Sequence, residues 1–101
     1  MEYNIVISIR AKQMLGVHLK FISNVNKDAA RKTKQKIIEG ISSLDKMPTR
    51  FPFLNELYIP PNKYHKMYIE NWYLILFQIK DNTVYVEHIV DCRQDYGWLI
   101  K

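Results

Sequence analysis

An arginine flanked by two acids follows the last strand-like run of this 101-residue chain. The run Thr83–Val90 alternates in hydrophobicity, and Arg93 comes shortly after it, between Asp91 and Asp95. A guanidinium in such a place can stabilise charge on a phosphate, and the hydroxyl of Tyr96 can carry a proton. The alternative is that Arg93 only pairs with the two acids at the surface, an interaction worth about 0–1 kcal/mol.

Basic and aromatic side chains also gather on the strands before this point. Such side chains on one exposed sheet face supply charges for phosphates and stacking planes for the bases of single-stranded RNA. They can also cleave RNA without metal, which needs a base, an acid and cations that stabilise the phosphate. The set consists of Lys63, Tyr64, His65, Lys66, Tyr68, Tyr73, Arg93, Tyr96 and Trp98. As an alternative, Tyr96 and Trp98 only attach the tail to the sheet.

His65 and Lys66 are neighbours on a predicted strand, so their side chains leave opposite faces. One face carries Tyr64, Lys66 and Tyr68, and the other carries His65, Met67 and Ile69. We expect the more apolar face, with Met67 and Ile69, to be covered by helices. This favours Lys63 or Lys66 with Arg93 as the electrostatic residues, and Tyr96 or His88 as proton carriers. His65 is then either a buried, hydrogen-bonded histidine or a rim residue.

The positive charge of the chain is unevenly placed. The formal net charge is +5, yet Arg10 to Lys36 alone holds eight basic residues and one acid, Asp28. Such a surface suits a phosphate backbone or an acidic protein partner, although a solvated helix face is the alternative.

Composition excludes several classes of site. Cys92 is the only cysteine, which rules out an internal disulfide and a cysteine-based zinc site. His18, His65 and His88 lack metal-ligand spacing, so we expect neither metal nor cofactor. No signal pattern opens the chain, and no apolar run approaches the roughly 20 residues that span a bilayer. We therefore expect a cytoplasmic protein without membrane contact.

Hydrophobic periodicity predicts a single α+β domain over residues 1–101, with a helical hairpin packed on a small, mainly antiparallel sheet. The order is β-α-α-β-β-β followed by a short tail. The predicted elements are a strand at 3–9, helices at 10–25 and from Asp28 to Leu44, an irregular connector at 46–62 that packs onto the body, strands at 63–69, 72–79 and 83–90, and a tail at 93–100.

Helix caps and core-facing residues follow from the same pattern. Ser8 and Asp28 are the expected N-caps of the two helices. The predicted core stripe of the first helix is Met14, Val17 or His18, Phe21, Ile22 and Val25, and that of the second is Ala30, Thr33, Ile37, Ile41 and Leu44.

Three stretches resemble the RelE/ParE toxin family of bacterial type II toxin–antitoxin systems. They are "VISIRAKQML", "AARKTKQKIIEGISSLDKMPTRFPFL" and "KYHKMYIENWYLILFQIKDNTVYVEHIVDCRQDYGWLI", and together they span nearly the whole chain. Two places carry the likeness most specifically. One is His65-Lys66 leading into the strand from Tyr73 to Phe77, and the other is the run Arg93-Gln94-Asp95-Tyr96.

The resemblance implies a toxin that a neighbouring gene's antitoxin holds inactive. One branch of the family cleaves mRNA on the ribosome without metal, and the other has the same fold but poisons DNA gyrase. Lys63, Lys66, Arg93 and Tyr96 resemble functional residues of the family. The predicted catalytic residues are Lys66, Arg93, Tyr96 and His65, and the predicted substrate-binding residues are Lys63, Tyr73 and Arg50. Asp91 and Asp95 would orient the guanidinium of Arg93.

The leading expectation is a ribosome-dependent mRNA endoribonuclease, with antitoxin, ribosome and mRNA as partners. Tyr73 stands where the nuclease branch has an arginine, and the His-Tyr ending of another nuclease group is missing. A gyrase inhibitor is the alternative, and a member that only binds its antitoxin or the operator-bound complex is a third possibility.

Overall fold

In the computed structural model of the chain, residues 2–56, 59–70 and 72–92 are described. The elements are β1 (Asn4–Ile7), α1 (Ile9–Ser23), α2 (Lys27–Ser42), the short 3-10 helices η1 (Ser43–Asp45) and η2 (Pro48–Arg50), β2 (His65–Ile69), β3 (Tyr73–Lys80) and β4 (Thr83–Asp91). The predicted order of elements from the first strand to the last and the α+β class are confirmed. The predicted tail at 93–100 lies outside the described residues.

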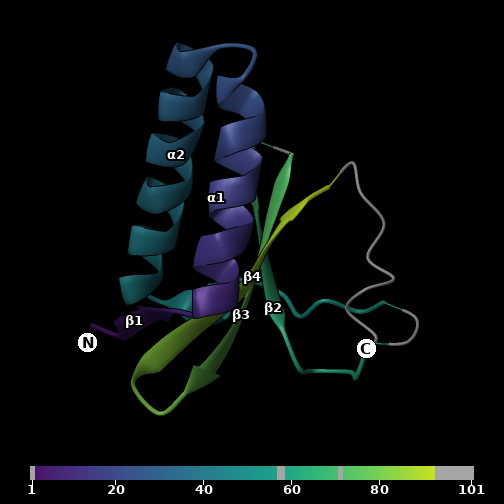
Figure 1. Ribbon diagram of the computed structural model, residues 1–101. Coiled ribbons are helices and arrows are strands. Elements are labelled where there is room, and N and C mark those ends of the chain that lie inside the picture. Colours follow the sequence, from purple (N-terminus) through teal and green to yellow (C-terminus); the bar gives the residue numbers. More distant parts are fainter. Residues whose placement is uncertain (1, 57–58, 71, 93–101) are drawn as a thin grey trace.

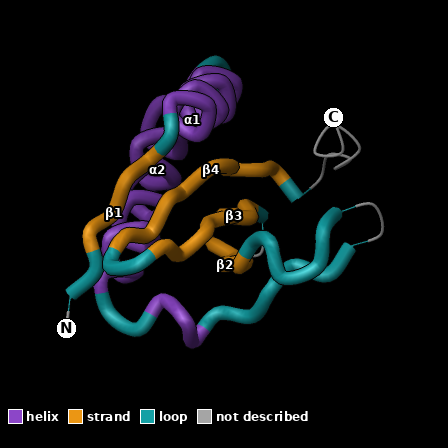
Figure 2. The backbone as a smooth tube through the Cα atoms, turned by 90° about the horizontal axis from the view of Figure 1, so that it is seen from below, coloured by secondary structure: helices purple, strands orange, loops and turns teal. Residues whose placement is uncertain are grey.

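The strands form one sheet in the order β1-β4-β3-β2. β4 pairs antiparallel to β3, and β3 pairs antiparallel to β2, whereas β1 runs parallel to β4 at the edge. The helical hairpin lies against one face of the sheet (Figure 1), and the connector between η2 and β2 runs across the other (Figure 2). Glu70 and Asp81 take positive φ values of 57° and 55° in the two hairpin turns. Aspartate tolerates this left-handed conformation better than most residues.

The sheet has a hydrophobic cluster on each face. The helix-face cluster consists of Ala11, Ile37, Ile41, Leu44, Met67, Ile69, Tyr73, Ile75, Phe77, Val84, Val86 and Ile89. The connector-face cluster consists of Leu54, Ile59, Tyr64, Leu74, Leu76 and Val90. Because β3 contributes to both clusters, its residues from Tyr73 to Phe77 are all buried, as a central strand requires.

The first helix cap is where the sequence predicts it, and the second is not. Ser8 Oγ accepts a hydrogen bond from the Ala11 amide at 3.0 Å. The N-cap of α2 is Asn26, whose side chain accepts from the Ala29 amide at 3.1 Å. Asp28 therefore lies in the first turn of α2, where its carboxylate pairs with Arg31 at 2.7 Å.

The predicted core stripe of α1 is partly wrong. Val17, Phe21 and Val25 are 68%, 71% and 86% exposed, whereas Ala11 is fully buried. Leu15, His18 and Ile22 occupy the inward face, and His18 Nε2 lies 2.9 Å from the Ile89 carbonyl oxygen. Apolar residues occupy two adjoining faces of α1, so periodicity alone does not select the inner one. The stripe of the second helix is confirmed at Ala30, Ile37, Ile41 and Leu44, although Leu44 lies in η1.

The connector packs onto the sheet as predicted. Leu54 and Ile59 are 1% and 8% exposed in the connector-face cluster. Its backbone also protects the outer edge of β2. The Leu54 amide donates to the Tyr64 carbonyl at 2.7 Å, and the Lys66 amide donates to the Pro52 carbonyl at 2.9 Å.

Candidate functional site

The side chains of His65 and Lys66 lie on opposite faces of β2, as the alternation of a strand predicts. His65 lies on the helix-covered side with Met67 and Ile69. Its Nδ1 is 2.8 Å from the Phe51 carbonyl oxygen, and its ring stacks on Phe77 with centroids 5.3 Å apart. These contacts describe a packed, hydrogen-bonded histidine that is half-buried, nearer to the first of the two roles that the sequence left open.

Lys66 lies on the connector face, among aromatic rings and one histidine. Its ammonium is 6.0 Å from the centroid of Tyr68, and that of Lys63 is 5.1 Å from Tyr64. The rings of Tyr64 and His88 meet edge to face with centroids 5.5 Å apart. We call these residues, Lys63, Tyr64, Lys66, Tyr68 and His88, the basic–aromatic cluster.

A β-bulge brings His88 to this face. The register between β3 and β4 shifts at Leu76 and Phe77, which pair with His88 and Val86. Glu87 is therefore an extra residue in β4, and strict alternation is interrupted there. Val86 points to the helix-face cluster, whereas His88 lies beside Tyr64 on the other side.

Burial and positive neighbours keep His88 neutral. Burial lowers its pKa below the ordinary value of 6.5, and the charge of Arg10 lowers it further. Lys63 acts in the same direction, while Glu87 acts against it. At neutral pH the imidazole is thus uncharged and lies in the field of two cations. Arg10, near the start of α1, was not among the predicted site residues, because only the tertiary structure brings it to His88.

The depressed pKa of His88 predicts a pH-dependent stability. Between the folded pKa and the unfolded value near 6.5, the unfolded chain binds more protons, so stability is full above about pH 6.5 and falls as the pH drops through the folded pKa. Phenylalanine does not titrate, so the melting temperature of a His88→Phe variant should fall less than that of the wild type when the pH is lowered from 7 to 5. Parallel melting curves for the two proteins across this range would contradict the assignment.

β3 places a different residue in the candidate site from the one predicted. Tyr73 is 5% exposed in the helix-face cluster, and its ring lies 5.7 Å from that of His18. It therefore does not share a face with Lys66. The residues of β3 that pair with Tyr68 and Lys66 on the connector face are Leu74 and Leu76, both fully buried. In the described part of the site, β3 thus contributes hydrocarbon rather than charge.

The other predicted site residues lie apart or outside the described part. Arg50 is exposed in η2, with its guanidinium 4.5 Å from the Phe51 ring centroid. It also donates hydrogen bonds to the carbonyls of Lys46 and Met47, so its guanidinium is bound to the backbone of the segment just before it. Arg93 and Tyr96 lie outside the described residues.

Two general features bear on the kind of site. Among residues 2–56, 59–70 and 72–92, no three His, Cys, Asp or Glu side chains form a group that could hold a metal ion. In the same part of the chain, neither α1 nor α2 has the length and apolar character of a bilayer-spanning helix.

Comparison with known proteins identifies the fold. Neither a protein-family model nor a curated protein matches the sequence. Among solved structures, a chain of the chromosomal ParDE TA system from P. aeruginosa matches with a TM-score of 0.74 and 15% sequence identity. The match covers 89% of this chain and 96% of that chain. The chain therefore has the ParE-like α+β fold, as its resemblance to the RelE/ParE family predicted.

Proposed function

We propose that the chain is a cytoplasmic toxin of a two-protein toxin–antitoxin pair. Three observations support this proposal. Its fold matches that of a chain of a ParDE system over 89% of its length. The eight basic residues between Arg10 and Lys36 suit an acidic protein partner. A stripe of apolar side chains on α1 is exposed, as in proteins that bind another chain.

We further propose that the toxin acts by binding its target, in the manner of the gyrase-inhibiting branch. One observation carries this choice: Leu76 and Leu74 are the β3 residues that pair with Lys66 and Tyr68, and both are fully buried. Metal-free RNA cleavage depends on cations arranged around the phosphate, each worth about 10²–10³-fold in rate. The two leucines supply no such cation from β3, and they leave this part of the sheet face as a packed hydrophobic surface.

The second candidate is the mRNA endoribonuclease, which the basic–aromatic cluster favours. Lys63 and Lys66 supply charge, and Tyr64 and Tyr68 supply rings on which bases can stack. His88 is neutral, because burial and Arg10 lower its pKa, and a neutral imidazole can accept a proton. Arg93 and Tyr96 remain the predicted transition-state stabiliser and proton carrier of this candidate.

An induction experiment separates the two candidates. After induction in a test bacterium, labelled-precursor incorporation into DNA should stop before incorporation into protein, and mRNA should stay intact. The variants Lys66→Ala and Arg93→Ala should arrest growth within a few-fold of the wild type. Cleaved mRNA, with about 10²–10³-fold slower cleavage by either variant, would establish the nuclease instead.

The same experiment tests the partner. A short acidic protein encoded beside the gene should restore growth when it is co-expressed. A native locus without such a reading frame, together with normal growth on induction, would contradict the toxin proposal itself.

A further inference from the structure

A pocket of about 290 Å³ lies between α2 and the turn that joins β2 to β3. Lys32, Thr33 and Lys36 of α2 line one side of it. Ile69, Glu70, Trp72 and Tyr73 of the β2–β3 hairpin line the other side. Ile69 and Tyr73 belong to the helix-face cluster, so the pocket is on the opposite side of the sheet from the basic–aromatic cluster.

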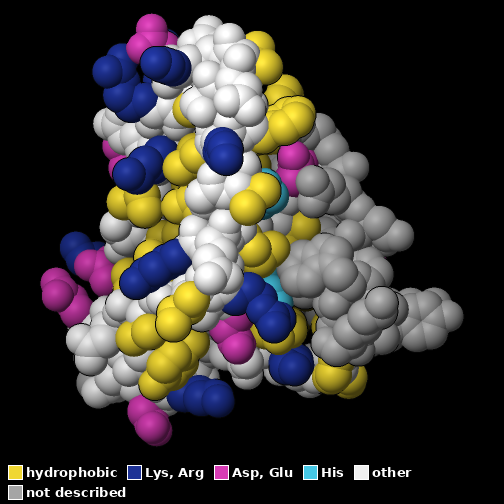
Figure 3. All heavy atoms as spheres, in the orientation of Figure 1, with side chains coloured by type: hydrophobic (Ala, Val, Ile, Leu, Met, Phe, Trp, Pro, Cys, Tyr) yellow, Lys and Arg dark blue, Asp and Glu magenta, His cyan; other side chains and the backbone are white. Residues whose placement is uncertain are grey.

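The α2 side of the pocket carries two ammonium groups and a hydroxyl. Lys32 and Lys36 are four residues apart, so they lie on the same side of the helix, next to Thr33. Lys32 takes part in neither of the two ion pairs that join described residues, and Lys36 pairs with Glu70 at 3.1 Å. An ammonium has three donors, so Lys36 keeps donors for a ligand. Figure 3 shows further Lys and Arg side chains along the α2 side of the hairpin, and their charge attracts anions.

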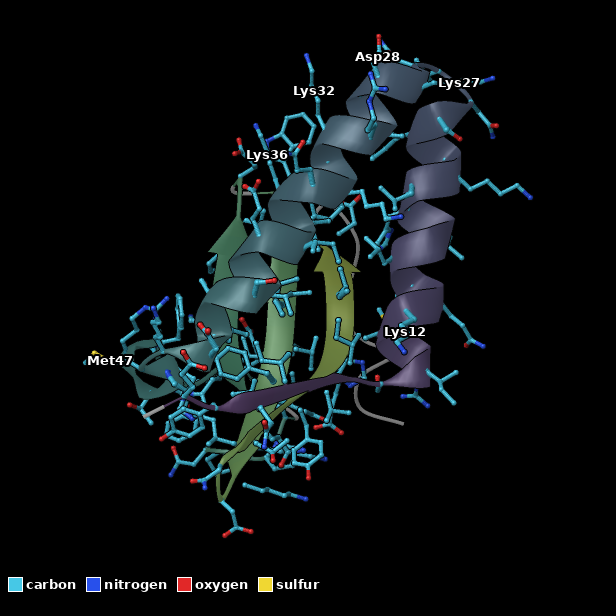
Figure 4. All side chains as sticks on the ribbon, turned by 90° about the vertical axis from the view of Figure 1, so that its left-hand side faces the viewer. Lys12, Lys27, Asp28, Lys32, Lys36 and Met47 are labelled. Atoms are coloured by element: carbon cyan, nitrogen blue, oxygen red, sulfur yellow. The ribbon has the colours of Figure 1, made fainter. Side chains whose placement is uncertain are left out.

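The packing of α2 on β2 places these cations over the turn. Gly40, one helical turn after Lys36, lies so close to β2 that a Cβ at this position would collide with the side chain of Ile69. α2 therefore contacts the sheet closely at Gly40. Figure 4 shows that α2 continues beyond the ends of the strands, with Lys36 beside the β2–β3 turn and Lys32 further along on the same side. This part of the helix overhangs the turn, and the pocket lies between them.

Trp72 supplies an aromatic wall on the hairpin side. Its amide donates to the Ile69 carbonyl at 3.1 Å, and its carbonyl accepts from the Cys92 amide at 2.8 Å, so its backbone is held on both sides. Its side chain is nevertheless 55% exposed. An indole on a fixed backbone offers a flat apolar surface on which a nucleobase can stack. Ile69 and Tyr73 are buried and form the inner wall.

We propose that this pocket binds a nucleoside 5′-monophosphate, with the phosphate on Lys32, Thr33 and Lys36 and the base against Trp72. The carboxylate of Glu70 accepts hydrogen bonds from the ribose hydroxyls while it holds the Lys36 ammonium. The volume lies at the lower end of the range of about 300–1,000 Å³ for small-molecule sites, which suits one nucleotide rather than a dinucleotide. The site goes beyond the proposed function, since neither candidate activity uses it.

The arrangement of charge favours a free nucleotide over a nucleic acid strand. A strand is held by a row of cations that follows its successive phosphates. Arg31, the next basic residue toward the start of α2, is instead paired with Asp28 at 2.7 Å. The two lysines that line the pocket therefore suit a single phosphate group.

Calorimetric titration of the purified chain with AMP tests the site. AMP should bind with a Kd below about 1 mM, and its affinity should fall as the salt concentration rises, because the phosphate is held by charge. Adenosine and inorganic phosphate each carry one half of the ligand, so each should bind at least about ten-fold more weakly than AMP.

Two pocket variants have matched controls. Lys32→Gln should weaken AMP binding about ten-fold, the scale of one charge-assisted hydrogen bond. Lys34→Gln makes the same change at an exposed residue of α2 that is not among the described residues lining the pocket, and should alter the affinity less than about two-fold. Trp72→Ala should weaken binding by about ten-fold or more, since the base loses its stacking partner. Phe21→Ala removes an exposed ring from α1 and should have no effect. All four side chains are exposed, so the melting temperatures should match that of the wild type.

Three results would overturn the site. The first is absence of AMP binding at about 10 mM. The second is an equal effect of Lys32→Gln and Lys34→Gln, which would reduce the binding to general attraction by a basic helix. The third is a short oligoadenylate that binds far more tightly than AMP, which would make a strand the occupant. Each result can be obtained with a chain that arrests growth, so failure of the pocket is distinguishable from failure of the proposed function.

Discussion

Replacing Phe77 by alanine should lower the free energy of unfolding by about 3–5 kcal/mol. Phe77 is fully buried in β3, and its ring meets Phe51 edge to face with centroids 6.1 Å apart. It also stacks on His65 at 5.3 Å, so removing it leaves a cavity beneath two aromatic neighbours. Because small domains are stable by only about 5–15 kcal/mol, much of the fold's stability would disappear.

Urea denaturation followed by circular dichroism measures this loss. Phe77→Leu is the control, since it keeps an apolar side chain in place and should cost clearly less than Phe77→Ala. A Phe77→Ala protein within about 1 kcal/mol of the wild type would show that Phe77 does not anchor the helix-face cluster as described.

His65→Ala should lower the free energy of unfolding by about 2–4 kcal/mol. The variant loses the part-buried bond to the Phe51 carbonyl, and leaving a buried carbonyl without a partner costs about 1–3 kcal/mol. It also removes the ring that lies between Phe53, 4.2 Å away, and Phe77. The lost packing adds to the cost of the lost hydrogen bond.

Lys66→Ala is the matched control on the same strand. The ammonium of Lys66 lies 6.0 Å from the centroid of the Tyr68 ring, and such partly exposed contacts are worth about 0.5–1 kcal/mol. Thermal melts of the two variants should therefore differ by several degrees. A larger loss for Lys66→Ala, or a stable His65→Ala protein without toxicity, would reverse the assignment of the two faces. His65 and Phe77 are in contact, so their combined effect should not be additive.

The sequence by itself determined those features that depend on near neighbours in the chain. Ser8 caps α1 because its side chain lies within reach of the free amides in the first turn of the helix that follows. β3 lies inside the sheet because its run from Tyr73 to Phe77 is apolar on both faces, and both faces must be shielded from water. The opposite facing of His65 and Lys66 follows from the two-residue repeat of a strand. These local rules sufficed for the order of elements and the α+β class.

The tertiary structure decided those features in which a local pattern allows two outcomes. α1 has apolar residues on two adjoining sides. The side that faces the sheet is the one with the fully buried Ala11 and with His18, whose ring is hydrogen-bonded to β4. The extra residue Glu87 turned His88 toward Tyr64, which alternation along β4 does not predict. Pairing between β2 and β3 placed Leu74 rather than Tyr73 beside the basic–aromatic cluster. In each case the deciding contact lies between two different elements, so its energy is not visible in the local pattern of either one.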